Sequence, residues 1–152
     1  MKLAQINRIL VGVEALEGAS NDAFYKAKEL AEENNATLII AFVMDKNGYA
    51  SLERMDPHGF GRLKNQAQSR LKAYKEMAEE NGVKDVETVL EVGIPKKEME
   101  NLCEKYNIDM IVIGETGSSK VDRLFLGNTA KAIQKKAKCD VKVISTKEAV
   151  KK

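Results

Sequence analysis

Short apolar runs alternate with longer amphipathic segments from one end of the chain to the other. Five runs predict strands, at residues 9–13, 38–43, 86–92, 110–113 and 141–144. The first, second and fourth are almost continuously apolar, which is typical of strands buried on both faces of a parallel sheet. The third and fifth carry polar residues at or near alternate positions, so we expect them at the edges of the sheet.

Amphipathic segments with helical spacing lie between these runs. They predict helices over residues 21–34 and 63–81, from Pro95 onward, and over residues 129–137. Proline is tolerated in the first turn of a helix, and Gly82 is a typical residue just after a helix end. The apolar stripes expected to face the sheet are Phe24, Ala27, Leu30 and Ala31; Ala67, Leu71, Tyr74 and Ala78; Met99, Leu102, Cys103 and Tyr106; and Ala130, Ile133 and Ala137. Strands and helices in this alternation predict an α/β fold with a parallel sheet.

Residues 45–62 interrupt the alternation. The segment contains Gly48, Gly59, Gly61 and Pro57 and few periodic apolar residues, so we expect it to lack regular secondary structure. A stretch of that length is uncommon inside a compact domain and often forms a flexible lid or a binding loop. An insert loop tolerated at the surface is the alternative, and the pattern does not distinguish the two.

Length and charge narrow the class of protein. A chain of 152 residues has the size of one domain, and we expect a single domain over residues 1–152. The 25 Lys and Arg residues against 23 Asp and Glu residues leave a net charge of +2, which argues against a protein dedicated to nucleic acid. The longest apolar stretch, residues 38–44, is far shorter than the roughly 18–20 residues of a membrane span. We therefore expect neither a nucleic acid nor a membrane as a partner.

The cysteines and the histidine offer little catalytic chemistry. Cys103 and Cys139 are too few for a disulfide framework and have no close Cys or His neighbour at metal-ligand spacing. Two buried thiols in a reducing compartment explain them, so we expect a cytoplasmic protein. The single histidine, His58, lies in a polar stretch and is expected at the surface. No catalytic residue is predicted, and no metal site made of protein side chains alone.

Candidate ligand-binding residues follow two of the predicted strands. In an open α/β sheet, ligands bind at the carboxyl ends of the strands, where the strand order reverses. Gly12 lies near the end of the first strand, and a glycine-bearing segment over residues 114–129 follows the fourth. Within it, Gly127 stands directly before a predicted helix, whose free N–H groups and dipole favour a phosphate. Neither junction carries a Walker A or a G-x-G-x-x-G sequence.

The spacing of these glycines resembles the nucleotide signature of the universal stress protein family. That signature is Gly, two residues, Gly, nine residues and Gly, usually followed by Ser or Thr, and Gly114, Gly117 and Gly127 have its spacing. Residues 9–14 and the turn at 92–95 also resemble the family, so the resemblance covers nearly the whole chain. It implies a Rossmann-like, five-stranded parallel sheet in the order 3-2-1-4-5 with helices on both faces, which places the first and fourth strands side by side.

The resemblance also implies a site for ATP or another adenine nucleotide, with Mg²⁺ or Mn²⁺ held through the phosphates. The implied binding residues are Gly12, Val13, Glu14 and Val43 at the adenine end, Gly114 and Gly117 with Thr116 between them around the ribose, and Gly127, Asn128 and Thr129 at the phosphates. Two of them depart from the family pattern. Glu14 stands where Asp is usual, and Asn128 stands where a Ser or Thr hydroxyl is usual.

The last strand is the expected dimer interface. The resemblance implies a homodimer through this strand, whose apolar residues Val141, Val143 and Ile144 suit edge pairing, although Lys142 could equally protect an ordinary edge. The leading functional hypothesis is an ATP-binding regulatory module of the stress response with little or no turnover. The alternatives are a nucleotide-free homodimer acting through protein partners, and a slow ATP hydrolase or a protein that phosphorylates itself.

Overall fold

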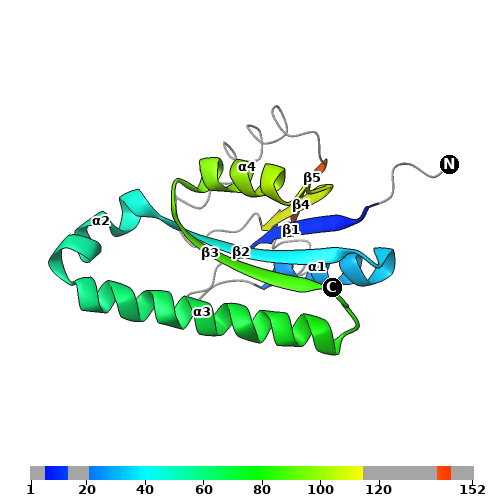
Figure 1. Cartoon of the computed structure of the whole chain (residues 1–152), viewed down its shortest axis with the longest axis horizontal. Helices are drawn as coiled ribbons and strands as arrows, with labels where there is room; N and C mark the ends of the chain where they lie inside the picture. The colour runs from blue at the N-terminus through cyan, green and yellow to red at the C-terminus, as the bar shows by residue number, and fades with distance from the viewer. Residues whose placement is uncertain (1–5, 14–20, 115–139, 145–152) are drawn as a thin grey trace.

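The computed structural model describes residues 6–13, 21–114 and 140–144, which form a parallel sheet with helices on both faces (Figure 1). The strands are β1 (Arg8–Gly12), β2 (Thr37–Asp45), β3 (Val86–Gly93), β4 (Met110–Gly114) and β5 (Asp140–Ile144). The helices are α1 (Asp22–Asn34), α2 (Lys46–Met55), α3 (Pro57–Glu80) and α4 (Pro95–Lys105). The predicted α/β fold is therefore confirmed, while the helix predicted over residues 129–137 lies outside the described residues.

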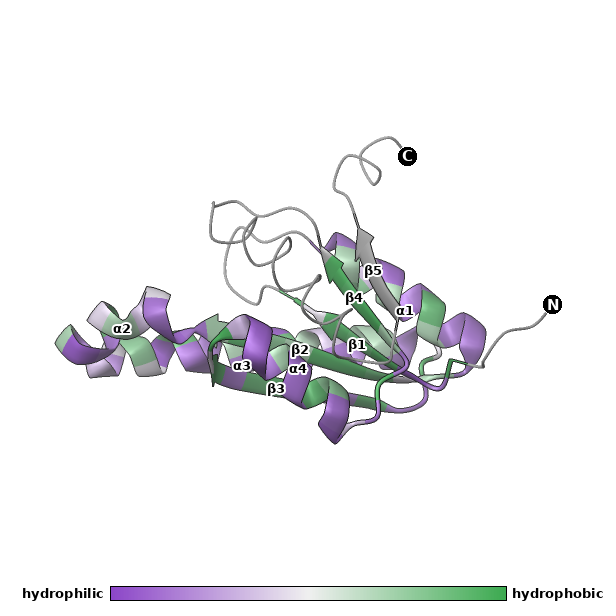
Figure 2. Cartoon of the chain, turned by 90° about the horizontal axis from the view of Figure 1, so that it is seen from above, coloured by the Kyte–Doolittle hydropathy of each residue, from purple (hydrophilic) through white to green (hydrophobic). Residues whose placement is uncertain are grey.

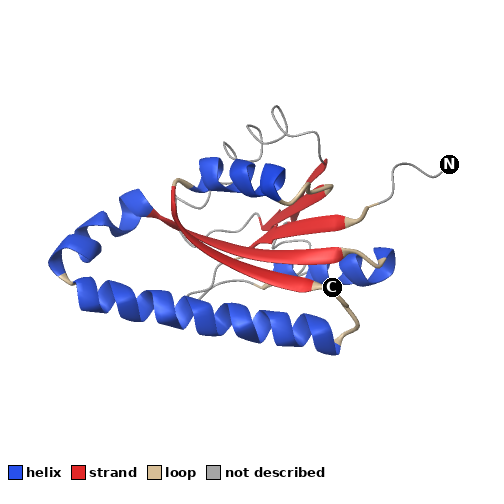
Figure 3. Ribbon diagram, viewed as in Figure 1, coloured by secondary structure: helices blue, strands red, loops and turns tan. Residues whose placement is uncertain are grey.

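The five strands lie in the order β3-β2-β1-β4-β5, and all neighbours pair in parallel (Figure 3). This is the order that the family resemblance implied. The almost continuously apolar strands β2, β1 and β4 occupy the centre, and Ile9, Leu10 and Val11 of β1 have no exposed surface. The strands with alternating polar positions, β3 and β5, lie at the two edges, as predicted.

Helices bury the sheet from both sides. On one face, Phe24 of α1 and Leu71 of α3 belong to the same apolar cluster as Ile40 of β2. On the other face, Met99 of α4 belongs to a second cluster with Ile111 of β4. Figure 2 shows the central strands as apolar ribbons with the helices packed around them. The predicted helix stripes are confirmed where they are described: Phe24, Ala27, Ala31, Ala67, Leu71, Tyr74, Ala78, Met99, Leu102 and Cys103 are buried, and Leu30 and Tyr106 are partly buried.

Helix ends follow local signals in the sequence. Pro95 is the first residue of α4, as predicted. α3 ends at Glu80, and Gly82 then adopts a φ of +102°, a backbone conformation that glycine reaches without strain. α1 ends before Asn35, which has a φ of 56°; asparagine tolerates this region better than most residues. No helix in the described part of the chain is long and apolar enough to cross a membrane.

The expectation that residues 45–62 lack regular secondary structure is wrong. α2 spans Lys46–Met55 and α3 begins directly afterwards at Pro57, which also places His58 in a helix, with its side chain exposed. Two aspartates cap these helices. The Asp45 side chain accepts a hydrogen bond from the Asn47 N–H, and the Asp56 side chain accepts one from the Gly59 N–H, both at 3.0 Å.

The glycines that suggested a loop lie inside these helices. A Cβ on Gly59 would lie only 2.2 Å from the capping Asp56 carboxylate, so the missing side chain makes room for the cap. Tyr49 of α2 and Phe60 of α3 then pack with their ring centroids 6.0 Å apart. α2 and the start of α3 project beyond the sheet past the carboxyl end of β2 (Figures 1 and 2). A lid function for this segment stays a prediction.

We expect Leu71→Ala to lower the free energy of unfolding by about 2–5 kcal/mol, because it opens a cavity at a side chain with no exposed surface. Lys72→Ala, an exposed position next to it on α3, is the matched control and should change this free energy by less than about 0.5 kcal/mol. Urea unfolding followed by circular dichroism measures both. Equal losses in the two variants would contradict the packing of α3 against the sheet.

Candidate functional site

The order of the strands reverses between β1 and β4. From β1 the chain proceeds outward through β2 to β3, and it returns to the other side of β1 for β4 and β5. Gly12 at the end of β1 pairs in register with Ile113, one residue before Gly114 at the end of β4. The ends of β1 and β4, which carry the glycines predicted separately from the sequence, are therefore adjacent at the switch point, where ligands of this fold class bind.

At this edge of the sheet, β2 extends beyond the end of β1. The Val13 N–H donates to the Ala41 carbonyl at 2.8 Å, which closes the pairing of β1 with β2. β2 continues to Asp45, and among the described strands this extension is paired with β3 alone. The predicted strand ends at Val43, but β2 continues for two more residues, so Val43 lies inside the strand. The extension offers backbone on the side where β1 has already ended.

Val13 and Val43 pack on opposite faces of the sheet. Val13 contacts the apolar cluster under α1 and α3, whereas Val43 contacts the cluster under α4. Both side chains are half-buried. The sequence placed them together at the adenine end of a nucleotide, but their side chains cannot meet one flat ring from the same side. Their shared contribution to this edge comes from the backbone.

Gly12, the last residue of β1, has a packing role. A Cβ at this position would lie 3.3 Å from the Met99 Cε and 3.9 Å from the Met99 Sδ. Met99 itself is only 1% exposed and comes from the middle of α4. The bare backbone of Gly12 therefore lets α4 approach the end of β1 closely. Spacing along the sequence gave no sign of this contact, because Gly12 and Met99 are far apart in the chain.

The start of α1 is anchored near the same edge. Asn21, the residue before α1, accepts a hydrogen bond through its side-chain Oδ1 from the Tyr74 hydroxyl of α3 at 2.5 Å. Because α1 returns the chain antiparallel to β1, this end of α1 lies on the side of the sheet where β1 ends. The contact ties the end of the β1–α1 connection to a helix buried against the sheet.

The remaining predicted site residues, Glu14, Thr116, Gly117, Gly127, Asn128 and Thr129, lie outside the described residues, so their positions stay predictions. Side chains arranged to hold a metal ion, in groups of three or more from His, Cys, Asp and Glu, do not occur in the described ranges. In the described ranges, this edge of the sheet therefore consists of the ends of β1, β2 and β4, with Gly12 and Gly114 as the last residues of β1 and β4. Such an edge can bind a ligand through N–H and carbonyl groups.

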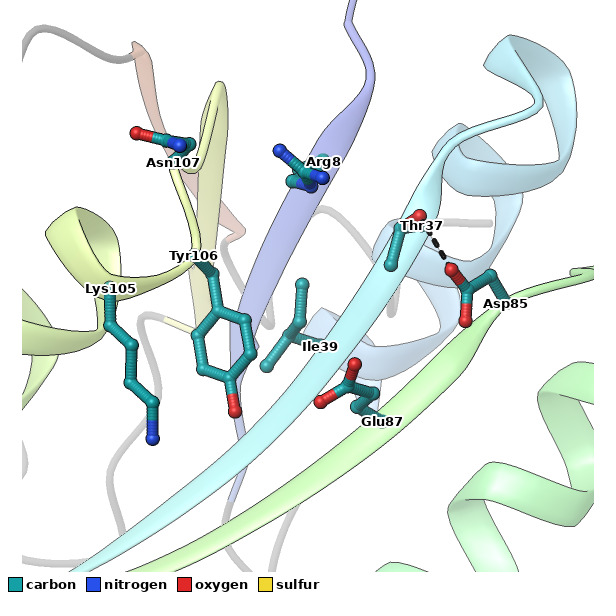
Figure 4. A pocket seen from close by; sticks show the side chains of 8 residues that line it. All are labelled: Arg8, Thr37, Ile39, Asp85, Glu87, Lys105, Tyr106 and Asn107. Carbon is teal, nitrogen blue, oxygen red and sulfur yellow. Dashed lines mark hydrogen bonds between the residues drawn. The ribbon is translucent and has the colours of Figure 1, made fainter.

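A hollow that was not predicted lies at the opposite, amino-terminal edge of the strands. It measures about 200 Å³ and is lined by side chains from β1, β2, the start of β3 and the end of α4 (Figure 4). Its residues come from parts of the chain that only the fold brings together. No motif or spacing in the sequence marks them.

Strand order, crossover helices and a glycine-lined switch point define the doubly wound α/β class, in which ligands bind beyond the carboxyl ends of the strands. The Universal stress protein family model matches residues 5–145, and the chain belongs to this family. A Staphylococcus aureus protein named "Putative universal stress protein" is 38% identical over 141 residues, which are 92% of this chain and 84% of that relative.

Solved structures agree with this assignment. Universal stress protein UspA from Lactobacillus plantarum is 26% identical with a TM-score of 0.77, over 93% of this chain and 99% of that one. A universal stress protein in complex with cAMP is 23% identical with a TM-score of 0.63, over 94% and 99% of the two chains. The universal stress protein from Archaeoglobus fulgidus in complex with dAMP is 17% identical with a TM-score of 0.62, over 93% and 99%.

We expect Gly12→Val to lower the free energy of unfolding by about 1–3 kcal/mol, because the added methyl groups meet Met99. Met99→Ala alone should lower it by about 2–5 kcal/mol through the cavity it leaves. The double variant should lose less than the two single variants combined, by at least about 0.5 kcal/mol, because the new side chain fills that cavity.

Chemical denaturation of the four proteins measures this coupling. Gly61→Val is the matched control for a glycine replacement, since no atom lies within 4 Å of a Cβ built on Gly61. Strict additivity of Gly12→Val and Met99→Ala would contradict a direct contact between β1 and α4 at the crevice.

Proposed function

We propose that this protein binds an adenine nucleotide, ATP in the first place, in the crevice where β1 and β4 end side by side. It would act as a regulatory module of the stress response with little or no turnover. The single observation that supports this best is the adjacency of Gly12 and Gly114, the two glycine-bearing strand ends, at the reversal of strand order. Backbone without side chains lets a ligand approach closely, and the switch point is where ligands of this fold class bind.

In the proposed complex, the adenine lies against the end of β1 and the β2 extension. Gly12, Val13, Glu14 and Val43 would surround it, chiefly through backbone groups. The ribose would lie at Gly114, Thr116 and Gly117, and the phosphates at Gly127, Asn128 and Thr129 with Mg²⁺ or Mn²⁺ bound through them. Glu14 reaches one methylene further than the usual Asp, and Asn128 can offer an amide N–H in place of a hydroxyl.

Two relatives with the same fold support the nucleotide class. One was solved with cAMP and the other with dAMP. Both ligands contain adenine, a five-membered sugar and a single phosphorus, so the parts they share are those that the β1, β2 and β4 edge is proposed to hold. A net charge of +2 does not weigh against this proposal, because backbone N–H groups rather than a large positive field would bind the phosphates.

Nucleotide binding is tested by thermal unfolding with MgATP, ADP, AMP and cAMP, followed by calorimetric titration. A ligand that binds only the native state raises the midpoint temperature, by about 2–4 °C for each kcal/mol of stabilisation. Gly127→Val should weaken ATP binding at least tenfold, or by about 1.4 kcal/mol. Gly61→Ala, a glycine in α3 with open space around it, is the matched control and should bind as the natural protein does.

An unchanged midpoint with all four nucleotides at millimolar concentration would overturn the proposal and favour a nucleotide-free protein. Sustained release of phosphate over many turnovers would instead assign a hydrolase. Binding without such release is the outcome expected here.

We further propose a homodimer through β5. This strand lies at the edge of the sheet and pairs with β4 on one side. The edge of a parallel sheet presents unpaired backbone N–H and carbonyl groups to a second chain. Pairing of β5 with its two-fold-related copy would give these groups hydrogen-bond partners in both chains. The proposed dimer would work in the cytoplasm with protein partners; the buried thiol of Cys103 is compatible with a reducing compartment.

Sedimentation equilibrium at micromolar concentration should give the mass of a dimer. Val143→Glu in β5 should shift the protein toward the monomer, because a carboxylate resists burial between two copies. Val92→Glu in β3, a position 36% exposed at the opposite edge, should leave the mass unchanged. A monomeric mass for the natural protein would refute the dimer, whatever the two variants do.

A further inference from the structure

The hollow at the amino-terminal edge of the sheet takes no part in the proposed function. It lies at the starts of β1 and β2, whereas the crevice lies where β1 and β4 end. Its volume of about 200 Å³ suits a ligand of a few heavy atoms. The side chains that line it are Arg8, Thr37, Ile39, Asp85, Glu87, Lys105, Tyr106 and Asn107 (Figure 4).

The sheet supplies the floor and one wall of this hollow. Arg8 of β1 is in register with Thr37 of β2, and Ile39 of β2 is in register with Glu87 of β3. Ile39 belongs to the apolar cluster under α4, and side chains two apart on a strand share a face. The Thr37 hydroxyl donates to the Asp85 carboxylate at 3.1 Å, which orients Asp85.

The end of α4 supplies the opposite wall. Lys105 is the last residue of the helix, and its Nζ lies 5.3 Å from the centroid of the Tyr106 ring. Asn107 then adopts a φ of 52°, and the Ile108 N–H donates to the Cys103 carbonyl at 3.0 Å as the chain turns into β4. Because the chain turns here, α4 does not extend over the first residues of β2 and β3.

Opposite charges face the hollow without pairing. Arg8 and Lys105 are cationic, and Asp85 and Glu87 are anionic, yet among the described residues none of the four has an oppositely charged group within 4.0 Å. In Figure 4, Lys105 and Tyr106 lie on one side of Ile39, and Asp85 and Glu87 lie on the other. β1 and β3 are separated by β2, so two strand spacings, roughly 10 Å in total, separate the backbone of Arg8 from that of Asp85.

We propose that this hollow binds a small zwitterion of the α-amino acid class. Its ammonium group would lie against Glu87 or Asp85, and its carboxylate against Arg8, while Lys105 lies beyond the Tyr106 ring (Figure 4). An α-amino acid of a few heavy atoms is small enough for a hollow of about 200 Å³. The Tyr106 ring offers an apolar surface for an aliphatic side chain.

The arrangement of charges disfavours ligands with a single charge. A phosphate or another simple anion would be attracted by Arg8 and repelled by Glu87, and a simple amine would meet the reverse. A zwitterion meets an attractive partner at both ends. Because all four charged side chains are exposed, each contact is screened by water, and affinity depends on both ends binding together.

Binding is tested by two-dimensional NMR of the ¹⁵N-labelled protein with glycine, L-alanine and L-valine as probes. The expected result is a saturable shift of the backbone amides of Thr37, Glu87 and Asn107. L-Valinamide, which lacks the carboxylate, and N-acetyl-L-valine, which lacks the ammonium group, should each bind at least tenfold more weakly than L-valine.

Three variants locate the site. Glu87→Gln and Arg8→Gln should each weaken L-valine binding at least tenfold, whereas Glu91→Gln, four residues further along β3 on the same face and outside the hollow, should leave it unchanged. The amide signals of all three variants should stay dispersed, as in a folded protein, since Arg8 and Glu87 are exposed and Glu91 is only partly buried. ATP titration of the same variants separates this site from the crevice.

Absence of saturable shifts with all three amino acids would overturn the proposal. So would equal binding of L-valine and either single-charge analogue, or a loss in Glu91→Gln as large as that in Glu87→Gln.

Discussion

The burial of β1 on both faces is the constraint on which the rest of the structure depends. Ile9, Leu10 and Val11 have no exposed surface, so helices must cover both sides of the sheet at this strand. A parallel neighbour on each side of β1 requires a crossover connection in each direction. The order β3-β2-β1-β4-β5 satisfies both requirements, and it places the ends of β1 and β4 side by side at the reversal of strand order. The proposed nucleotide site is therefore a consequence of how the central strand is buried.

The two edges of the sheet carry different groups, because glycines end β1 and β4 at one edge and α4 stops short of the other. At the carboxyl edge, Gly12 and Gly114 end their strands without side chains, and Met99 packs beneath Gly12. At the amino edge, α4 stops at Lys105, and the charged side chains of Arg8 and Glu87 face the space it leaves. A nearly balanced total charge is compatible with both edges, because neither needs a field of one sign.

Local capping explains the segment that the sequence pattern misjudged. Glycine and proline at residues 48–61 predict a loop, yet Pro57 occupies the first turn of α3 and Gly59 leaves space for the Asp56 carboxylate. The apolar contacts that hold α2, such as Tyr49 against Phe60, join residues of two different helices. The apolar period within one helix does not reveal contacts between two helices. Neither α2 nor the start of α3 therefore shows a clear helical pattern in the sequence.

The sequence by itself determined the class of fold, the central and edge strands, and the buried stripes of α1, α3 and α4. It could do so because these properties depend on which residues avoid water and with what period, and period is a local property of the chain. Only the tertiary structure decided that Val13 and Val43 pack on opposite faces, that Met99 lies against Gly12, and that Arg8 and Glu87 face one hollow. Each of these depends on register between strands and on where a helix stops, which are set by packing between segments distant in sequence.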